Sequence, residues 1–298
     1  MRHKTVGIDG RPVCHLIGVL LLVLAGAMLL PAVVDVMSDH NDWRVFFASA
    51  GVTGVAGGVM TVAYRPAGAA TLSTRQAFLL TTGSWVVVCL FASLPFLFSS
   101  LDMSLADAYF ETMSGLTTTG STVIVGLDRA PPGILLWRSL LQGLGGIGII
   151  VMAVAVLPDL RIGGMQLFRM ESSDKTDKVM PRVSQMASMI IVIYVLLNMA
   201  CALALWASGM NWFDAITHAP PVVSTGGFST YDESVGHFHS PLIEWILVAF
   251  MMLGATTFTL YVALLRHKGW RLLRGGAGDV GMGNARDRLW RCGAAGGL

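Results

Sequence analysis

Residues 104–150 read SLADAYFETMSGLTTTGSTVIVGLDRAPPGILLWRSLLQGLGGIGII, and they carry the most informative pattern of the chain. A short amphipathic segment, 104–116, stops at a run of threonines and a glycine over 117–120. The segment is too short and too polar to cross a bilayer, which takes about 20 apolar residues. A long apolar segment, 133–158, follows it. This order of parts predicts a half-helix and a polar turn held between two membrane spans.

The composition indicates that most of the chain does not face water. Of its 298 residues, 54% are hydrophobic and only 13% are charged, whereas a soluble domain averages about 25% charged residues. The expected fold class is therefore an all-α polytopic membrane protein. A net charge of +2 gives no reason to expect a nucleic-acid partner. The four cysteines show no CxxC or Cys/His ligand spacing, so we expect reduced thiols that pack as small apolar groups.

Six apolar segments have the length that a helix needs to cross the hydrocarbon. They cover residues 15–37, 43–64, 76–98, 133–158, 183–208 and 241–265. The first run has no small-residue cleavage site, so it is expected to span rather than to act as a cleavable signal. The expected regions are two leading helices (1–75), a span–half-helix–span unit (76–158), a cytoplasmic loop (159–182), a second unit (183–266) and a basic, disordered or frameshifted Gly/Arg-rich tail (267–298).

Lysine and arginine predict how the chain crosses the membrane, because cytoplasmic loops carry an excess of both. They concentrate in the N-terminal segment, in the loops over 65–75 and 159–182, and after the sixth span. The opposite side holds only three arginines but eight acids, namely Asp39, Asp42, Asp102, Asp107, Asp128, Asp214, Asp232 and Glu233. The N-terminus is therefore expected in the cytoplasm, and both half-helices enter from outside. Their acidic flanks would concentrate cations at the mouth.

The start of the half-helix occurs twice in the sequence. Ser104-x-x-Asp107 is matched by Asn211-x-x-Asp214, and each pattern predicts a helix N-cap with an acid in the first turn. Each copy lies between two apolar spans. Repetition of a whole unit is stronger support for the fold than any single motif.

Each predicted half-helix, over 104–116 and 211–222, leads into a turn rich in Thr, Ser and Gly. Aligning the turns pairs Thr118-Thr119-Gly120-Ser121 with Ser224-Thr225-Gly226-Gly227 across a one-residue gap. Backbone carbonyls, with occasional hydroxyls, can replace the water around a potassium-sized ion, and glycine permits the backbone conformations that aim carbonyls inward. One such turn is equally well explained as a surface loop. Two in register, each after a capped half-helix, favour a cation site.

Five segments carry a family resemblance: Asp107–Val123 (DAYFETMSGLTTTGSTV), Trp137–Pro158 (WRSLLQGLGGIGIIVMAVAVLP), Gly163–Arg169 (GGMQLFR), Asp177–Arg182 (DKVMPR) and Val223–Tyr231 (VSTGGFSTY). In order and spacing they resemble the Trk/Ktr/HKT superfamily of potassium transporters, in particular its bacterial TrkH/TrkG branch. The resemblance covers about residues 10–266.

The resemblance implies two leading helices and four span–half-helix–span units around one pore, which moves potassium, in some members sodium, into the cell across the bacterial inner membrane. It implies a homodimer in membrane lipid on cytoplasmic nucleotide-binding regulatory subunits of the TrkA type. K+ would be the transported ion, with no cofactor in this chain. By match to the family's filter, the ion-lining residues would be Thr118, Thr119, Gly120, Ser224, Thr225 and Gly226, supported by Thr117, Ser121, Val223 and Gly227.

The chain departs from the family pattern in its later part. It contains two of the four units, and residues from about Gly269 onward no longer resemble the family. Two units supply half of a filter ring. A truncated, non-transporting half that needs a second chain is therefore the alternative to potassium uptake.

Other motifs in the sequence suggest competing chemistry. The glycines over 143–148 match GxGxxG, but they lie in a span and predict close helix packing, because a dinucleotide site needs a preceding strand. His237 and His239, with His218, suggest an external metal site without a further ligand, and His218 is expected to cap or pack in the half-helix. An intramembrane Ser/His pair, paired aspartates and HExxH are all absent from the sequence, so an enzyme is not expected.

Three residues near the turns predict local features. Arg138, one turn into a span, is expected to extend to the outer surface or to pair with an outer acid such as Asp128. Glu111 either hydrogen-bonds the turn or faces outside water, and the sequence favours neither. Pro221 cannot donate to a helical ladder and predicts an early end to the second half-helix.

Overall fold

The computed structural model describes residues 9–66, 72–160 and 179–265, and every regular element in these ranges is helical. The α-helices are α1 (Arg11–Met37), α2 (Trp43–Ala63), α3 (Thr74–Ala92), α4 (Leu94–Phe98), α5 (Leu105–Leu116), α6 (Pro132–Leu160), α8 (Val179–Ala207), α9 (Trp212–Val223), α10 (Pro241–Ala255) and α11 (Phe258–Leu265). Two 3₁₀ turns, η1 (Leu127–Arg129) and η2 (Ser234–Phe238), follow the half-helices. The all-α class is confirmed. The predicted loop over 159–182 and tail over 267–298 lie almost entirely outside the described residues.

Four of the described helical segments are long and apolar enough to cross a membrane. They are Arg11–Met37, Trp43–Ala63, Arg75–Phe98 and Met186–Ala207. Large apolar side chains remain exposed along them, among them Val23, Val55 and Leu196. Such outward apolar faces are expected where lipid, rather than water, surrounds the helices.

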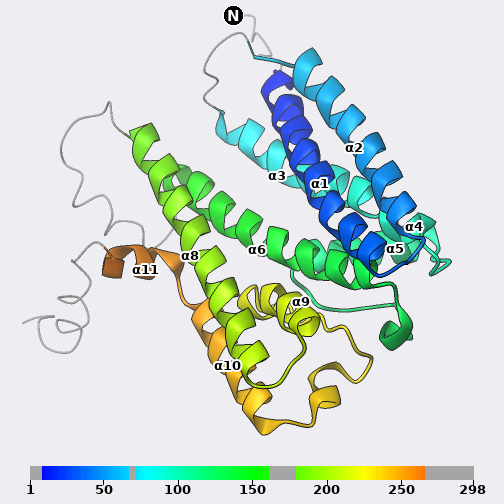
Figure 1. Ribbon diagram of the computed structural model, residues 1–298. Helices are drawn as coiled ribbons and strands as arrows, with labels where there is room; N and C mark the ends of the chain where they lie inside the picture. The colour runs from blue at the N-terminus through cyan, green and yellow to red at the C-terminus, as the bar shows by residue number, and fades with distance from the viewer. Residues whose placement is uncertain (1–8, 67–71, 161–178, 266–298) are drawn as a thin grey trace, which may run out of the picture. The chain divides into compact units, whose positions relative to one another are not determined.

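Helices α1 and α2 pack together over their length, side by side in Figure 1. A β carbon on Gly57 would lie 2.8 Å from the carbonyl oxygen of Gly18, so the two backbones nearly touch. Within α2, Thr61 Oγ1 donates to the Gly57 carbonyl oxygen at 2.7 Å. Small residues permit this close approach at Gly57, whereas Gly51 and Gly58 face open space.

Helix α6 is anchored to the leading helices at its N-terminal end. The backbone N–H of Gly133 donates to Oδ1 of Asp35 on α1 at 2.6 Å. An acid suits this position because the first N–H groups of a helix lack intrahelical partners and carry partial positive charge. One turn later the buried Trp137 donates from Nε1 to the Ala92 carbonyl oxygen at 3.1 Å and meets Phe46 edge-on.

Two predicted spans are divided. The segment over 76–98 becomes α3 and α4, which meet at Ser93 just before Pro95, a residue with no N–H for the ladder. The segment over 241–265 becomes α10 and α11, interrupted at Thr256 and Thr257, so the prediction of one continuous sixth helix is wrong. Threonine is a weak helix former because its side chain loses χ1 freedom in a helix. Residues to Ala255 form one compact unit, and the chain from Thr256 belongs to a second.

The two half-helices are present with the predicted N-caps. In α5 the Ser104 side chain accepts from the Asp107 N–H, and in α9 the Asn211 side chain accepts from the Asp214 N–H. Each helix has 12 residues. Each also packs against the long helix α6.

The predicted early end of the second half-helix is wrong. Helix α9 continues through Pro220 and Pro221 to Val223. Proline fixes φ near −65°, which suits a helix, although each one removes its own N–H bond and crowds the carbonyl of the fourth residue before it. The carbonyl oxygens of Pro220 and Pro221 still accept from Ser224 and Gly226, which closes the last turn.

Candidate functional site: two equivalent turns

The turns after α5 and α9 have the same backbone. Thr118 and Thr225 both take the left-handed conformation, with φ of 55° and 57°. Gly120 and Gly227 follow with φ of 81° and 80°. Non-glycine residues rarely adopt positive φ. Two threonines that do so at the same step after a capped half-helix indicate one shared local fold.

The two turns also share their backbone hydrogen bonds at equivalent positions. The Thr119 N–H donates to the Ser114 carbonyl oxygen at 2.9 Å, and the Gly226 N–H donates to the Pro221 carbonyl oxygen at 2.8 Å. Every equivalent pair is 107 positions apart, with no gap. The alignment that paired Gly120 with Gly226 across a gap is therefore wrong. The structural equivalent of Gly120 is Gly227.

The predicted site residues all lie in or beside these turns. Thr119, Ser121, Thr225 and Gly227 are exposed, Thr117, Thr118, Gly120 and Ser224 are half-buried, and Val223 and Gly226 are buried. Some of their groups are already engaged: the Thr117 hydroxyl bonds the Met113 carbonyl oxygen at 2.7 Å, and the Ser121 carbonyl oxygen accepts from the Ser114 hydroxyl at 2.5 Å. Each turn thus keeps two exposed residues.

The two turns meet at Gly120. A β carbon there would overlap the carbonyl oxygen of Gly226, so no larger residue fits without moving the second turn. Behind Gly226 lies Gln142 of α6, which is fully buried. Its Oε1 accepts from the Phe228 N–H at 3.0 Å, and its side chain fills the space where Gly226 would carry a β carbon.

Glycines of the long helices contact the ends of the half-helices. A β carbon on Gly145 would overlap the Leu116 carbonyl at the end of α5, and one on Gly254 would overlap the Val223 carbonyl at the end of α9. Since the C-terminal end of a helix carries partial negative charge, both turns begin at electronegative positions. Gly145 belongs to the GxGxxG match, which lies wholly within α6, so the predicted packing role is confirmed at Gly145, whereas Gly148 of the same match faces open space.

Each turn is followed by an extended segment that a buried side chain of the half-helix holds. Glu111, fully buried, accepts from the Val123 N–H at 2.9 Å and from the Thr122 hydroxyl at 2.9 Å. At the equivalent position in α9, His218 bonds from Nε2 to the Ser229 hydroxyl at 2.9 Å. The hydrogen-bonding alternative for Glu111 and the packing role of His218 are both confirmed.

Arg138 has a different place from the one expected. Its side chain is 1% exposed, and Nε donates to Oε1 of Glu111 at 2.8 Å. Extension to the surface is therefore wrong, whereas the alternative of pairing with an acid holds with Glu111 in place of Asp128. Its partner comes from α5, which packs on α6 and brings the carboxylate to the guanidinium. Burial of this charge is stabilised by the pairing and by its additional hydrogen bonds.

Asp214 organises the outer side of the second turn. Its buried carboxylate accepts from the Thr230 hydroxyl at 2.9 Å, from the Tyr231 hydroxyl at 2.8 Å and from Asn211 Nδ2 at 2.6 Å. Burial and the neighbouring Asp214 carboxylate raise the pKa of Tyr231 to about 12. The Tyr231 hydroxyl therefore keeps its proton at neutral pH and remains a donor. His237, considered as a metal ligand, stacks on the Tyr231 ring at 3.6 Å between centroids.

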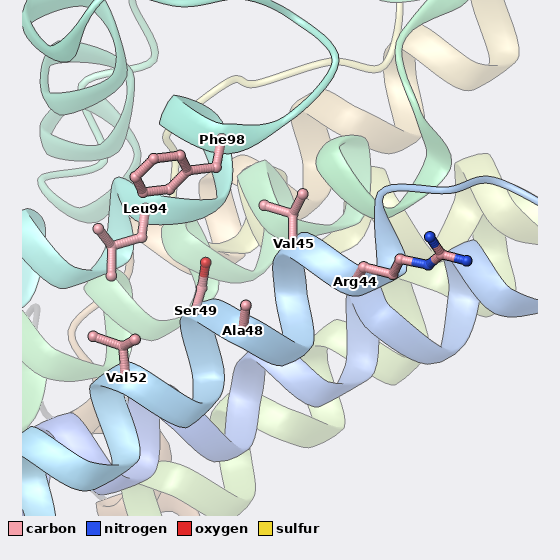
Figure 2. A pocket seen from close by; sticks show the side chains of 7 residues that line it. All are labelled: Arg44, Val45, Ala48, Ser49, Val52, Leu94 and Phe98. Atoms are coloured by element: carbon pink, nitrogen blue, oxygen red, sulfur yellow. The ribbon is translucent and has the colours of Figure 1, made fainter.

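A separate groove of about 500 Å³ lies between α2 and α4. Figure 2 shows Val45, Ala48 and Val52 of α2 facing Leu94 and Phe98 of α4, while the Arg44 side chain extends away from them. Ser49 supplies the one hydroxyl in this lining. A dehydrated cation needs several oxygens around it, so the groove lacks the ligands that the two turns possess.

The fold and the paired turns define an all-helical membrane protein in which two short capped helices each lie between long apolar helices. The family model for TrkH, described as a cation transport protein, matches residues 45–277. The chain belongs to this family.

Named relatives agree with the family match. The chain is 42% identical to the Trk system potassium uptake protein TrkH of Salmonella typhimurium over 258 residues, which is 86% of this chain and 53% of the relative. It is 37% identical to the Trk system potassium uptake protein TrkG of Escherichia coli over 87% of this chain and 54% of the relative. The crystal structure of the potassium transporter TrkH from Vibrio parahaemolyticus superposes with a TM-score of 0.78 at 38% identity, covering 88% of this chain and 53% of that one. The chain thus spans about half the length of the curated relatives it matches.

Proposed function

We propose that the chain acts in potassium uptake across the bacterial inner membrane and that its two turns line the ion pathway. The supporting observation is that two turns with one backbone conformation meet at Gly120 and Gly226. Converging carbonyl and hydroxyl oxygens are suited to replace the water around K+. The names of its relatives, potassium uptake proteins, support the same ion.

The proposed ligands are oxygens of both turns. They are the oxygens of Thr118, Thr119 and Gly120 in the first turn and of Ser224, Thr225 and Gly226 in the second, with Thr117, Ser121 and Val223 in support. Gly227 moves from a supporting position to a ligand position, because it is the equivalent of Gly120. K+ is the transported ion in this proposal, and no cofactor is assigned.

We also propose an orientation of the chain in the membrane and a set of partners. The Lys and Arg distribution supports a cytoplasmic N-terminus, with both turns reached from outside. The pore-forming parts would be the units over 76–158 and 183–266, preceded by the leading helices over 1–75. The family resemblance supports a homodimer in lipid and a nucleotide-binding regulatory subunit of the TrkA type as partners.

Rubidium uptake into proteoliposomes that contain the purified chain tests this function. The unchanged chain should accumulate Rb+ and K+ should compete, whereas the variant with both Gly120→Ala and Gly227→Ala should lose uptake. Gly126→Ala is the matched control, since Gly126 also has a positive φ of 83° but lies outside the turns with open space around it. Full uptake by the double variant would overturn the assignment of the turns.

A further inference from the structure

Arg138 lies at the junction of the two span–half-helix–span units. It is carried by α6, which packs against both half-helices. The side chain is almost completely buried. A guanidinium presents its donors in a rigid planar fork, so its partners are held at fixed relative positions.

The fork of Arg138 reaches both units at once. Nε donates to Oε1 of Glu111 in the first unit at 2.8 Å, and Nη1 donates to the Ser229 carbonyl oxygen in the second unit at 2.6 Å. The guanidinium carbon also lies 4.1 Å from the centre of the Phe228 ring. Two of these three contacts are made with the segment that leaves the second turn.

Each partner is itself joined to a turn. Glu111 holds the Val123 N–H, three residues after Gly120. Ser229 comes two residues after Gly227, and its hydroxyl accepts from the Tyr231 N–H at 3.2 Å. A shift of the guanidinium would therefore move the exits of both turns relative to each other.

We propose that Arg138 is a positioning residue that fixes the spacing between the two turns and thereby sets the preference among monovalent cations. Selection by an oxygen cage depends on the number and placement of its dipoles. A single rigid cross-link between the exit segments controls that placement without touching the ion. The effect on cation preference rests on the proposed transport function, whereas the coupling of the two segments does not.

Hydrogen–deuterium exchange of the purified chain tests the coupling directly. Arg138→Met should raise exchange at least tenfold in both 121–124 and 228–231, because Glu111 and the Ser229 carbonyl each lose their partner. Arg138→Lys should raise it only in 228–231, since one ammonium group can pair with Glu111 but lacks the second arm of the fork. Arg44→Met, which removes an exposed arginine of α2, should leave both segments unchanged.

Arg138→Met leaves the buried Glu111 carboxylate without its partner, which favours misfolding. A double variant that removes both charges avoids this problem. The double variant E111Q/R138M carries no buried charge here and should still show the increase in 228–231. In the rubidium assay, K+ and Na+ each compete with Rb+ for uptake, and the K+/Na+ ratio of inhibition should fall at least tenfold in this variant. Arg138→Lys should recover part of that ratio.

The outcomes separate the two proposals. Wild-type exchange at 228–231 in both Arg138→Lys and the double variant would overturn the coupling, and an unchanged K+/Na+ ratio beside raised exchange would overturn the role in cation preference. Absence of rubidium uptake by the unchanged chain would count against the proposed function, and the exchange data would then decide the coupling by themselves.

Discussion

The side chain of Gln142 occupies the space in which Gly226 would carry a β carbon. At Gly226 there is therefore no space for a β carbon. The next residue, Gly227, has open space around it but a φ of 80°, which favours glycine. Adjacent glycines in one turn thus serve two different physical needs. The difference can be measured.

Gly226→Ala should destabilise the chain by about 1–3 kcal/mol, the usual effect of overpacking. A second change, Gln142→Ser, frees the space and should offset part of this loss. A coupling energy above about 0.5 kcal/mol in a double-mutant cycle, from unfolding of the purified chain in SDS titrations, would establish the contact. Gly227→Ala should cost about 1–2 kcal/mol from its left-handed backbone and gain nothing from Gln142→Ser. Strict additivity at Gly226 would contradict the steric explanation.

Gly145→Ala should be among the most damaging single-methyl changes in α6, because its β carbon meets the Leu116 backbone, which cannot rotate away. We expect about 3 kcal/mol of destabilisation, at the upper end for overpacking. Gly148→Ala is the matched control on the same helix. Its β carbon meets nothing within 4 Å, so higher helix propensity should stabilise it by up to about 1 kcal/mol. Thermal unfolding of the two purified variants measures both effects, and equal midpoints would refute the packing role of Gly145.

The N-cap of α5 can be tested at one position. Ser104→Ala removes the acceptor of the Asp107 N–H and should cost about 1 kcal/mol, whereas Ser104→Gly should cost only a few tenths. Since both changes remove the hydroxyl, the difference between them isolates the backbone preference of the cap. Circular dichroism during unfolding supplies the measurement. If glycine proved as harmful as alanine, the hydroxyl's second bond, to Asp107 Oδ2, would account for the loss instead.

Tyr231→Phe removes a donor to the buried Asp214 carboxylate and should destabilise by about 1.5–3 kcal/mol, as for hydrogen bonds to charged groups. The folded pKa of Tyr231, about 12, lies above its ordinary value of 10.0. Its protonated form is therefore the stabilising one, and that contribution is complete below pH 10 and lost as pH rises toward 12. The stability gap between the unchanged chain and Tyr231→Phe should narrow across that window. Tyr64→Phe, at an exposed tyrosine, should show no such narrowing.

The sequence predicts what local chemistry determines. Both half-helices begin where Ser104 and Asn211 stand because an N-cap is a contact between near neighbours in the chain. The predicted register of the second turn is wrong because it pairs the first glycine of each turn, Gly120 with Gly226. Counting from the caps would have paired Gly120 with Gly227, as the backbone does.

The sequence alone does not predict which side chains of different helices contact each other. The partner of Arg138 lies 27 residues away on another helix, and only the packing of α5 on α6 selects Glu111 over the other acids. The role of Gln142 was missed for the same reason, since no motif marks a side chain whose task is to fill the space behind Gly226. The sixth span is divided at Thr256 and Thr257, where the low helix propensity of threonine is a weak signal. The apolar character of the whole segment is the stronger pattern in the sequence, and it predicts one continuous helix.

Glu111 and His218 stand at equivalent places and hold equivalent segments, yet one is a carboxylate and the other an imidazole. The carboxylate accepts from the Thr122 hydroxyl, and the imidazole bonds the Ser229 hydroxyl at the equivalent position. The path of the main chain after each turn therefore depends on a buried polar group that reaches this hydroxyl, and groups of different charge can supply it.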